Sequence, residues 1–166
     1  MGYYIKIEKK ILHALFDIKG SIKDVNSYLE DQIGSFPIEP NSFIKHKNLK
    51  ILYIGSEHWI IQAPIEEEES LLRLLAPNNC PSSLSIVLIS DTLTFFKING
   101  ANADDIMSIA SPLNFNMDVF AQNSVTFSEF FGLKALIMRE GDGYLFGIDQ
   151  SFGDMICDYI DLTLAT

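Results

Sequence analysis

The same strand-to-helix junction occurs near residue 20 and again near residue 100, and this repetition limits the folds that the chain can adopt. In each case a strand ends in Ile, one residue and a Gly follow, and a capped helix begins, in the segments 17–24 (DIKGSIKD) and 97–105 (KINGANADD). Glycine permits the sharp turn that lets a helix follow a strand directly. Two such junctions predict two similar modules of sheet and helix, either through an internal duplication or through a shared turn chemistry.

The first junction leads into a helix whose start and stop are both marked. A strand is expected over 12–18, and Ser21 then precedes a helical pattern that stops at Gly34. Ser21 and Asp24 have the S-x-x-D spacing of a capping box, with Asp in place of the usual Glu, and Gly is common just past a helix C-terminus. The apolar residues recur at the spacing of one helical face: Ile22, Val25, Leu29 and Ile33.

The rest of the first half predicts a loop, a hairpin, a helix and a second loop. Residues 36–48 hold two prolines and show no helical period, so we expect a loop. Apolar strands at 50–54 and 59–63 flank a polar turn, which is typical of a hairpin. Four glutamates at 66–69 suit the positive end of a helix dipole, with a cation site as the alternative. Residues 76–83 predict the second loop.

The second half repeats the alternation of strands and helices. Asn102 begins one helix, which Pro112 ends, and Ser151 begins another with Asp154 three residues on. The expected strands are 84–89, 93–98, 124–131, 133–139 and 144–148, and 141–143 forms a turn before the last one. Strands that alternate with helices and are partly joined as hairpins predict an α+β fold with antiparallel or mixed sheets. We expect a single domain over residues 1–166, with modules at 12–89 and 90–166.

Composition and charge exclude two classes of protein. The 166 residues include 12 basic and 22 acidic side chains, for a net charge of −10, whereas nucleic-acid surfaces need clustered Lys and Arg. No apolar run reaches the roughly 18–20 residues that cross a bilayer, and the N-terminus lacks a signal-peptide pattern. We therefore expect no nucleic-acid or membrane partner. Cys80 and Cys157 form no paired motif, so a reduced cytoplasmic protein is expected.

Sequence motifs that would identify an enzyme are absent. The chain has no G-x-S-x-G elbow and no phosphate-binding glycine pattern, and its three histidines lack a ligand partner at helical spacing. We expect no catalytic, cofactor-binding or metal-binding residue. Asp91 and Asp149 are the remaining candidates for acid–base chemistry because they follow strands, although turn and helix-start roles also explain them.

Apolar residues are in excess, at 48% of the chain against 20% charged, where about 25% charged is usual. This excess either fills a Phe- and Ile-rich core or is covered by a partner. Trp59 is expected to anchor the core rather than to act as a stacking platform. Aromatic and Met side chains are frequent in interfaces, so we predict a partner interface at Phe115, Met117, Phe120, Phe127, Phe130 and Phe131.

Several short segments, taken in order, resemble motifs of the gamma subunit of heterotetrameric sarcosine oxidase. Residues 54–61 (IGSEHWII) are similar to the family's "LGPDEWLL" hairpin, and residues 16–20 (FDIKG) resemble its "L-R-G" strand end. Further similar segments are 36–41 with "LP…PN", 90–91 and 98–103 with "S-D…L-x-G-x-x-A", 141–144 with "DGF" and 150–153 with "RSFA". The resemblance covers about residues 13–165.

The resemblance implies a non-catalytic subunit that packs against the alpha subunit, in a complex that also contains beta and delta subunits. The complex would demethylate sarcosine to glycine with FAD, FMN and NAD on the larger chains, and would release formaldehyde or pass the one-carbon unit to tetrahydrofolate. This chain would carry no cofactor and would have the fold of the folate-binding domain of the glycine-cleavage T-protein. N-methylglutamate dehydrogenase carries a similar subunit, so the amine substrate stays open.

Two departures from the family pattern bear on ligand binding. Leu88 replaces the Asp of a "D-V-S" pattern, and an aliphatic side chain cannot hold a folate amine as a carboxylate does. Gln150 replaces the Arg of "RSFA", which puts an anion contact in doubt. Two other functions remain open: a stand-alone folate or one-carbon-binding protein with a T-protein-like fold, and an unrelated α+β enzyme that uses Asp91 or Asp149.

Overall fold

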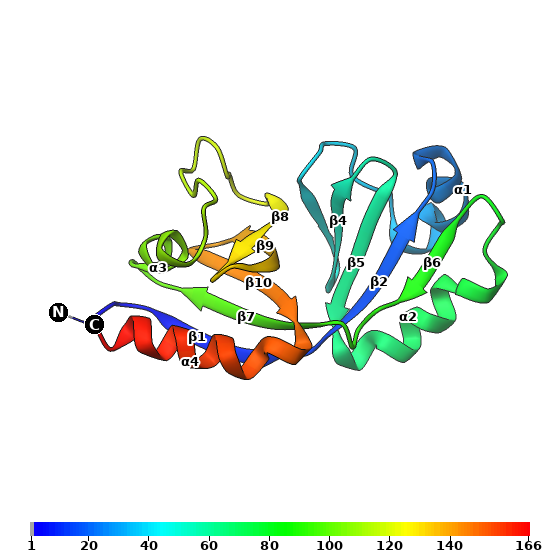
Figure 1. Cartoon of the computed structure of the whole chain (residues 1–166). Helices are drawn as coiled ribbons and strands as arrows, with labels where there is room; N and C mark the ends of the chain where they lie inside the picture. Colours follow the sequence, from blue (N-terminus) through cyan, green and yellow to red (C-terminus); the bar gives the residue numbers. More distant parts are fainter. Residues whose placement is uncertain (1) are drawn as a thin grey trace. The chain divides into compact units, whose positions relative to one another are not determined.

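The computed structural model describes residues 2–166, which divide into two compact units (Figure 1). Unit 2 is Leu12–Ser90, and unit 1 combines the residues up to Ile11 with Asp91–Thr166. Each unit is a five-stranded antiparallel sheet with two α-helices. The predicted α+β class, with two similar sheet-and-helix modules, is confirmed. None of the helices within the described residues is long and apolar enough to cross a membrane.

In unit 2 the strands lie in the order β3-β4-β5-β2-β6. The elements are β2 (His13–Lys19), α1 (Ile22–Ile33), β3 (Phe43–His46), β4 (Leu49–Gly55), β5 (His58–Pro64), η1 (Ile65–Glu67), α2 (Glu68–Leu75), η2 (Pro77–Asn79) and β6 (Ser85–Leu88). The expected loop at 36–48 is wrong in part, because β3 lies within it. Phe43 pairs opposite Leu52 of β4 and is buried, so the edge of β4 supplies the pairing that local sequence does not reveal.

Local chemistry sets the start and end of α1 as predicted. The Ser21 hydroxyl accepts a hydrogen bond from the Asp24 N–H at 3.1 Å. The N–H of Gly34 donates to the carbonyl of Glu30 at 2.9 Å. Both contacts satisfy backbone groups that a helix end leaves unpaired.

Trp59 anchors the core of unit 2, as predicted. Its ring is 1% exposed, and its indole N–H donates to the Pro37 carbonyl at 3.0 Å. The ring stacks on Tyr53, with centroids 5.1 Å apart, and meets the edge of Phe36 at 5.7 Å. The indole is thus packed and hydrogen-bonded within its own unit.

In unit 1 the strands lie in the order β1-β7-β10-β9-β8. The elements are β1 (Lys6–Ile11), β7 (Leu93–Asn99), α3 (Ala103–Ala110), β8 (Val125–Phe130), β9 (Leu133–Glu140), β10 (Gly143–Asp149), η3 (Gln150–Phe152) and α4 (Gly153–Leu164). Strand β1 was not predicted, because its four charged side chains obscure the alternation of apolar and polar residues that is typical of a strand. Its pairing with β7, with Lys6 opposite Asn99, makes it a strand.

Of the two helix starts predicted in unit 1, one is confirmed in position and one is wrong. Asn102 is the N-cap residue of α3, but its side chain accepts from the Tyr4 N–H and donates to the Asp105 carboxylate, and it makes no capping bond to the helix. Asp149, rather than Ser151, caps the final helical segment, because the Asp149 carboxylate accepts from the Ser151 N–H at 2.9 Å.

Both units contain, in chain order, a strand, a helix, three strands and a helix. In unit 2 the edge strand β6 follows this series, whereas in unit 1 the edge strand β1 precedes it. Each edge strand pairs with a strand that is not its neighbour in sequence. Strand β1 directly precedes β2 but pairs with β7, and β6 directly precedes β7 but pairs with β2. The repeated glycines make equivalent bonds. The N–H of Gly20 donates to the Glu57 carbonyl at 3.0 Å, and that of Gly100 donates to the Asp142 carbonyl at 3.4 Å.

Candidate functional site

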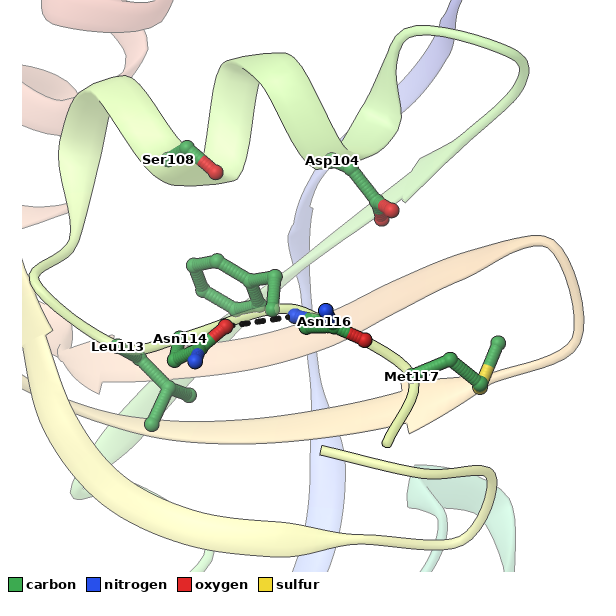
Figure 2. A pocket seen from close by; sticks show the side chains of 7 residues that line it. Asp104, Ser108, Leu113, Asn114, Asn116 and Met117 are labelled. Atoms are coloured by element: carbon green, nitrogen blue, oxygen red, sulfur yellow. Dashed lines mark hydrogen bonds between the residues drawn. The ribbon is translucent and has the colours of Figure 1, made fainter. Parts of the chain in front are cut away.

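A pocket of about 510 Å³ opens in unit 1 between α3 and the segment that follows it (Figure 2). Helix α3 ends at Ala110, and the segment that follows runs back along the helix on the other side of the pocket (Figure 2). The pocket is lined by Asp104, Ser108, Leu113, Asn114, Phe115, Asn116 and Met117. It therefore combines one carboxylate, two amides and a hydroxyl with three apolar side chains.

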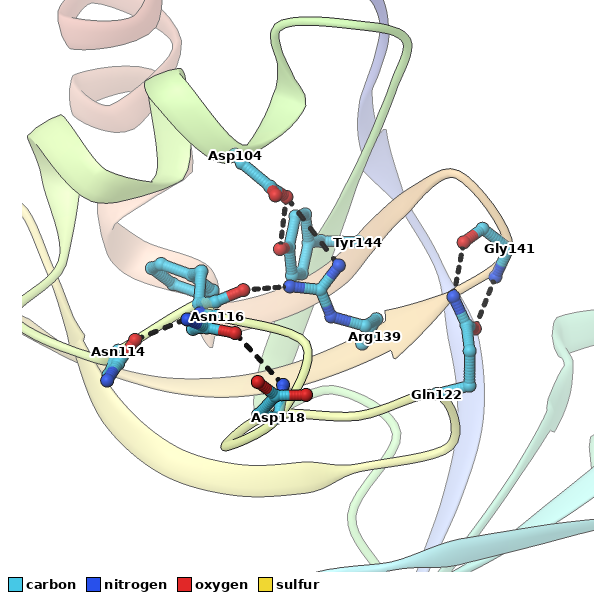
Figure 3. A network of polar contacts seen from close by, with 9 residues as sticks. Asp104, Asn114, Asn116, Asp118, Gln122, Arg139, Gly141 and Tyr144 are labelled. Carbon is cyan, nitrogen blue, oxygen red and sulfur yellow. Dashed lines mark hydrogen bonds and ion pairs between the residues drawn. The ribbon is translucent and has the colours of Figure 1, made fainter.

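Side-chain amides fix the backbone of this segment. The side-chain oxygen of Asn114 accepts a hydrogen bond from the backbone N–H of Asn116 at 2.9 Å (Figure 3). The side-chain oxygen of Asn116 accepts one from the backbone N–H of Asp118 at 3.0 Å. Asn and Asp stabilise turns by bonding to the backbone two residues on. With both oxygens engaged, the amide N–H groups of the two asparagines remain as the donors at the pocket.

Arg139 of β9 lies beneath this segment, with 4% of its surface exposed. Its guanidinium donates to the Phe115 carbonyl and lies 3.6 Å from the Asp104 carboxylate. It also lies 4.7 Å from the centroid of the Tyr144 ring, a cation–π distance. A buried cation is costly unless it is paired, so Arg139 ties α3 and the pocket segment to the sheet. Its Nε has no hydrogen-bond partner among the described residues.

Tyr144 of β10 is the second side chain of the sheet that contacts the Asp104 carboxylate. It lies opposite Arg139 in the β9–β10 register, and its hydroxyl donates to Asp104 at 2.5 Å (Figure 3). Burial, together with this hydrogen bond, raises the pKa of Tyr144 well above its ordinary value. The phenol therefore stays protonated and acts as a donor. Asp104 is held in one orientation as an acceptor for a cationic or N–H-bearing group, an arrangement suited to binding.

The structure separates the six residues predicted for a partner interface. Phe115, Phe120 and Phe130 are 5%, 4% and 0% exposed and pack in the core of unit 1. Met117 lines the pocket and is 48% exposed. Phe127 is exposed on β8, where the Lys134 ammonium lies over its ring.

The last member of that set, Phe131, is half-buried and contacts the rings of Phe130 and Tyr159. The alternation of strand β8 sends Phe130 inward and Phe127 and Glu129 outward. Sequence alone could not divide the set, because aromatic residues are common in both cores and interfaces.

The two aspartates considered for acid–base chemistry lie at exposed positions. Asp149 accepts two hydrogen bonds from Ser151, which hold the pKa of its carboxyl below the usual value. It is therefore ionised at neutral pH and serves the helix start. Within residues 2–166, no group of three or more His, Cys, Asp or Glu side chains is placed to hold a metal ion. Both cysteines are free thiols.

The network of Asp104, Tyr144 and Arg139 was not predicted from the sequence. Asp104 lies in the first turn of α3, where an acidic residue already suits the helix dipole. A signal did exist, since Arg139 directly follows the apolar run 135–138 of β9, and a buried arginine needs an acceptor. The identity of that acceptor depends on the strand register.

No family model matches the sequence, and no curated protein does either. Among solved structures, a chain of the heterotetrameric sarcosine oxidase from Corynebacterium sp. U-96, in complex with pyrrole 2-carboxylate, aligns with a TM-score of 0.82 and 13% identity. That alignment covers 97% of this chain and 84% of the other.

The glycine cleavage system aminomethyltransferase T from Bartonella henselae aligns with a TM-score of 0.70 and 9% identity. It covers 96% of this chain and 46% of the aminomethyltransferase, so this chain spans less than half of that protein. At such identities the similarity establishes architecture. The chain thus has the fold shared by a sarcosine oxidase chain and part of a glycine-cleavage T-protein, as the sequence resemblance implied.

Proposed function

We propose that this chain is a non-catalytic subunit of a sarcosine-oxidase-type flavoenzyme complex, corresponding to the gamma subunit. The observation that carries the proposal is the alignment that nearly fills both chains, 97% of this one and 84% of a chain from a heterotetrameric enzyme. A fold match that uses most of both chains supports an equivalent role in such a complex. The T-protein match covers 46% of that chain and supports this role less.

In this proposal the larger partner chains, alpha, beta and delta, carry the chemistry. They would hold FAD, FMN and NAD and oxidise an N-methyl amine, sarcosine or the substrate of a related N-methylglutamate dehydrogenase. The one-carbon unit would be released as formaldehyde or passed to tetrahydrofolate. The present chain would pack against the alpha subunit and bind none of these cofactors. The pocket carboxylate of Asp104 accepts a hydrogen bond from Tyr144 and lies beside the Arg139 guanidinium, which agrees with a binding or packing role.

The test is to tag the chain in its native cell, purify it gently and record both its companions and its visible spectrum. The proposal predicts co-purification with larger chains that show flavin absorbance and oxidise sarcosine or N-methylglutamate. Recovery of a colourless chain without companions, at a salt concentration low enough to preserve interfaces, contradicts it.

A second candidate is a stand-alone protein that binds folate or another one-carbon carrier. Two observations favour it: the T-protein-like fold and the fixed carboxylate of Asp104 beside two amides, a set able to bind an amino-substituted heteroaromatic ring. Leu88, which is aliphatic and 38% exposed, supplies no carboxylate at the position that the family pattern assigns to Asp.

Titration of the isolated chain with tetrahydrofolate tests this second candidate. Saturable binding that Asp104→Asn weakens, and that Asp31→Asn leaves unchanged, would favour it. Asp31 is an exposed residue of α1, so its substitution removes the same charge away from the pocket. No binding at millimolar ligand excludes the candidate.

A further inference from the structure

The four sheet edges of the two units are protected to different degrees. Edge strands expose unpaired backbone groups, and proteins block them with charged residues, proline or very short strands. Edge β1 carries four charged residues, β3 has four residues that include Lys45, and β8 carries Glu129. Edge β6, with the sequence Ser-Ile-Val-Leu, is as short as β3 but has neither a charge nor a proline. It is therefore the least protected of the four.

The backbone register shows which groups of β6 face outward. The Ile89 N–H donates to the Leu15 carbonyl at 2.9 Å, which identifies these opposed residues as a hydrogen-bonded pair. Antiparallel strands alternate such pairs with non-bonded ones, and Val87 lies opposite Asp17 two residues earlier. The N–H and C=O groups of Ile86 and Leu88 therefore point away from β2. No described strand pairs with β6 on that side.

A groove of about 440 Å³ lies beside this edge. It is formed by the end of α2, by η2 and by β6, and its lining is mainly apolar: Leu72, Ala76, Pro77, Ile86, Val87 and Leu88, together with Arg73, Asn78 and Asn79. Val87 is 48% exposed, and Leu72 and Leu88 are 39% and 38% exposed. Figure 1 shows the chain returning from α2 to β6 along this side of unit 2. Apolar side-chain area and open backbone groups thus occur together.

The charge of the groove indicates what can occupy it. Its lining contains no acidic residue, although the chain has a net charge of −10. Arg73 is its charged lining residue and pairs with Glu69 at 2.6 Å, but both side chains are more than two-thirds exposed, so this pair is weak and exchangeable. Two copies of so acidic a chain repel each other. A different chain that brings an apolar strand and a carboxylate for Arg73 complements the groove better.

We propose that β6 is the docking edge for a partner chain, which adds an extended apolar segment to the sheet of unit 2. The segment hydrogen-bonds to the outward groups of Ile86 and Leu88, its side chains cover Val87 and Leu72, and an acidic residue reaches Arg73. Strand addition of this kind takes affinity from the main chain and specificity from alternate side chains. The inference rests on the proposed function in that the partner is a larger subunit of the same complex.

Hydrogen exchange of the purified assembly tests this proposal directly. Amide protons of an open edge exchange quickly, whereas those paired with a new strand are protected. We expect the Ile86 and Leu88 amides to exchange at least about tenfold more slowly in the assembly than in the isolated chain. The amides of β1 serve as an internal control, and their exchange is expected to stay unchanged.

A matched pair of variants at Val87 separates strand addition from other kinds of contact. Val87→Lys places a charge on the edge, and Val87→Thr keeps a β-branched side chain of similar size. Val87→Lys is expected to weaken assembly by about tenfold, because a buried apolar contact is lost, while Val87→Thr changes it little. Leu88→Pro removes one outward N–H without removing a bond to β2 and is expected to weaken assembly as well.

The outcomes separate the failure of this inference from the failure of the proposed function. A flavin-bearing assembly in which Ile86 and Leu88 exchange as in the isolated chain overturns β6 docking and leaves the subunit proposal standing. A partner without flavin that protects these amides supports β6 docking and contradicts the subunit proposal. Concentration-dependent protection in the isolated chain identifies a second copy as the occupant and overturns the assignment to a different chain. A lone monomer with rapid exchange at β6 overturns both.

Discussion

The hydroxyl of Tyr144 makes a single hydrogen bond whose loss can be predicted from its surroundings. Tyr144→Phe keeps the ring against Phe115 and Arg139 but removes the donor to Asp104. A hydrogen bond to a charged group contributes about 1.5–3 kcal/mol. The lower end of this range applies here because the Asp104 side chain is 61% exposed. We therefore expect Tyr144→Phe to lower the free energy of unfolding by about 1.5 kcal/mol at pH 7.

The pH dependence of this difference has a definite sign. The pKa of Tyr144 is raised in the folded protein, because of burial first and then the bond to Asp104. Such a group stabilises the folded state fully below the unfolded pKa, about 10 for tyrosine, and that stabilisation is lost as the pH rises above it. The free energy of unfolding can fall by at most about 1.4 kcal/mol per pH unit through this one group. Solvent screening near Asp104 reduces the expected loss to about 0.5–1 kcal/mol between pH 10 and 11.

Urea unfolding at pH 7, 9, 10 and 11 measures both effects. The difference between wild type and Tyr144→Phe is expected to be constant up to about pH 9 and to shrink above about pH 10. Tyr53→Phe is the matched control, because Tyr53 also stacks in a core but its hydroxyl makes no bond to Asp104. If both variants unfold at the same urea concentration at every pH, the hydroxyl does not hold Asp104 and the account of the pocket is refuted.

Three further predictions concern stability. Arg139→Met keeps the apolar stem but leaves the Phe115 carbonyl without its donor, so the free energy of unfolding should fall by about 2–3 kcal/mol in urea; a change below about 0.5 kcal/mol would contradict the network. Gly100→Ala should lower the melting temperature more than Gly132→Ala, because the new Cβ would lie 2.4 Å from the Tyr4 carbonyl oxygen at position 100, whereas it meets open space at 132. Trp59→Phe should cost about 1–3 kcal/mol through the lost indole bond and volume; equal stability would mean that the indole is not packed as described.

Local signals predicted much of the fold. The S-x-x-D start of α1 and its terminal Gly34 work through bonds within a few residues, so sequence reveals them. The hairpin of β4 and β5 shows in two apolar runs around a polar turn. Edge strands β1 and β3 were missed because their pairing partners, β7 and β4, make them strands. Tertiary pairing of this kind leaves no local trace.

The candidate site was harder to predict because its three polar residues come from a helix and two strands. Tyr144 and Arg139 meet through the register of β9 and β10, and Asp104 reaches them from α3. The six residues predicted for the interface include both buried and exposed side chains for the same reason. Phe130 is buried and Phe127 is exposed because of which face of β8 meets the core. Residue type identified these side chains as candidates, but the strand register determines which of them are buried and which contact one another.

The mass and flavin content of the native assembly decide whether this chain is a subunit of a flavoenzyme. Light scattering with simultaneous visible absorbance, applied to the tagged chain after gentle purification, reports both quantities for the same particle. We expect a particle much heavier than the 18.7 kDa chain, with flavin absorbance that co-elutes with it. A colourless particle with the mass of one chain would contradict the claim that this protein is a subunit of a flavoenzyme complex.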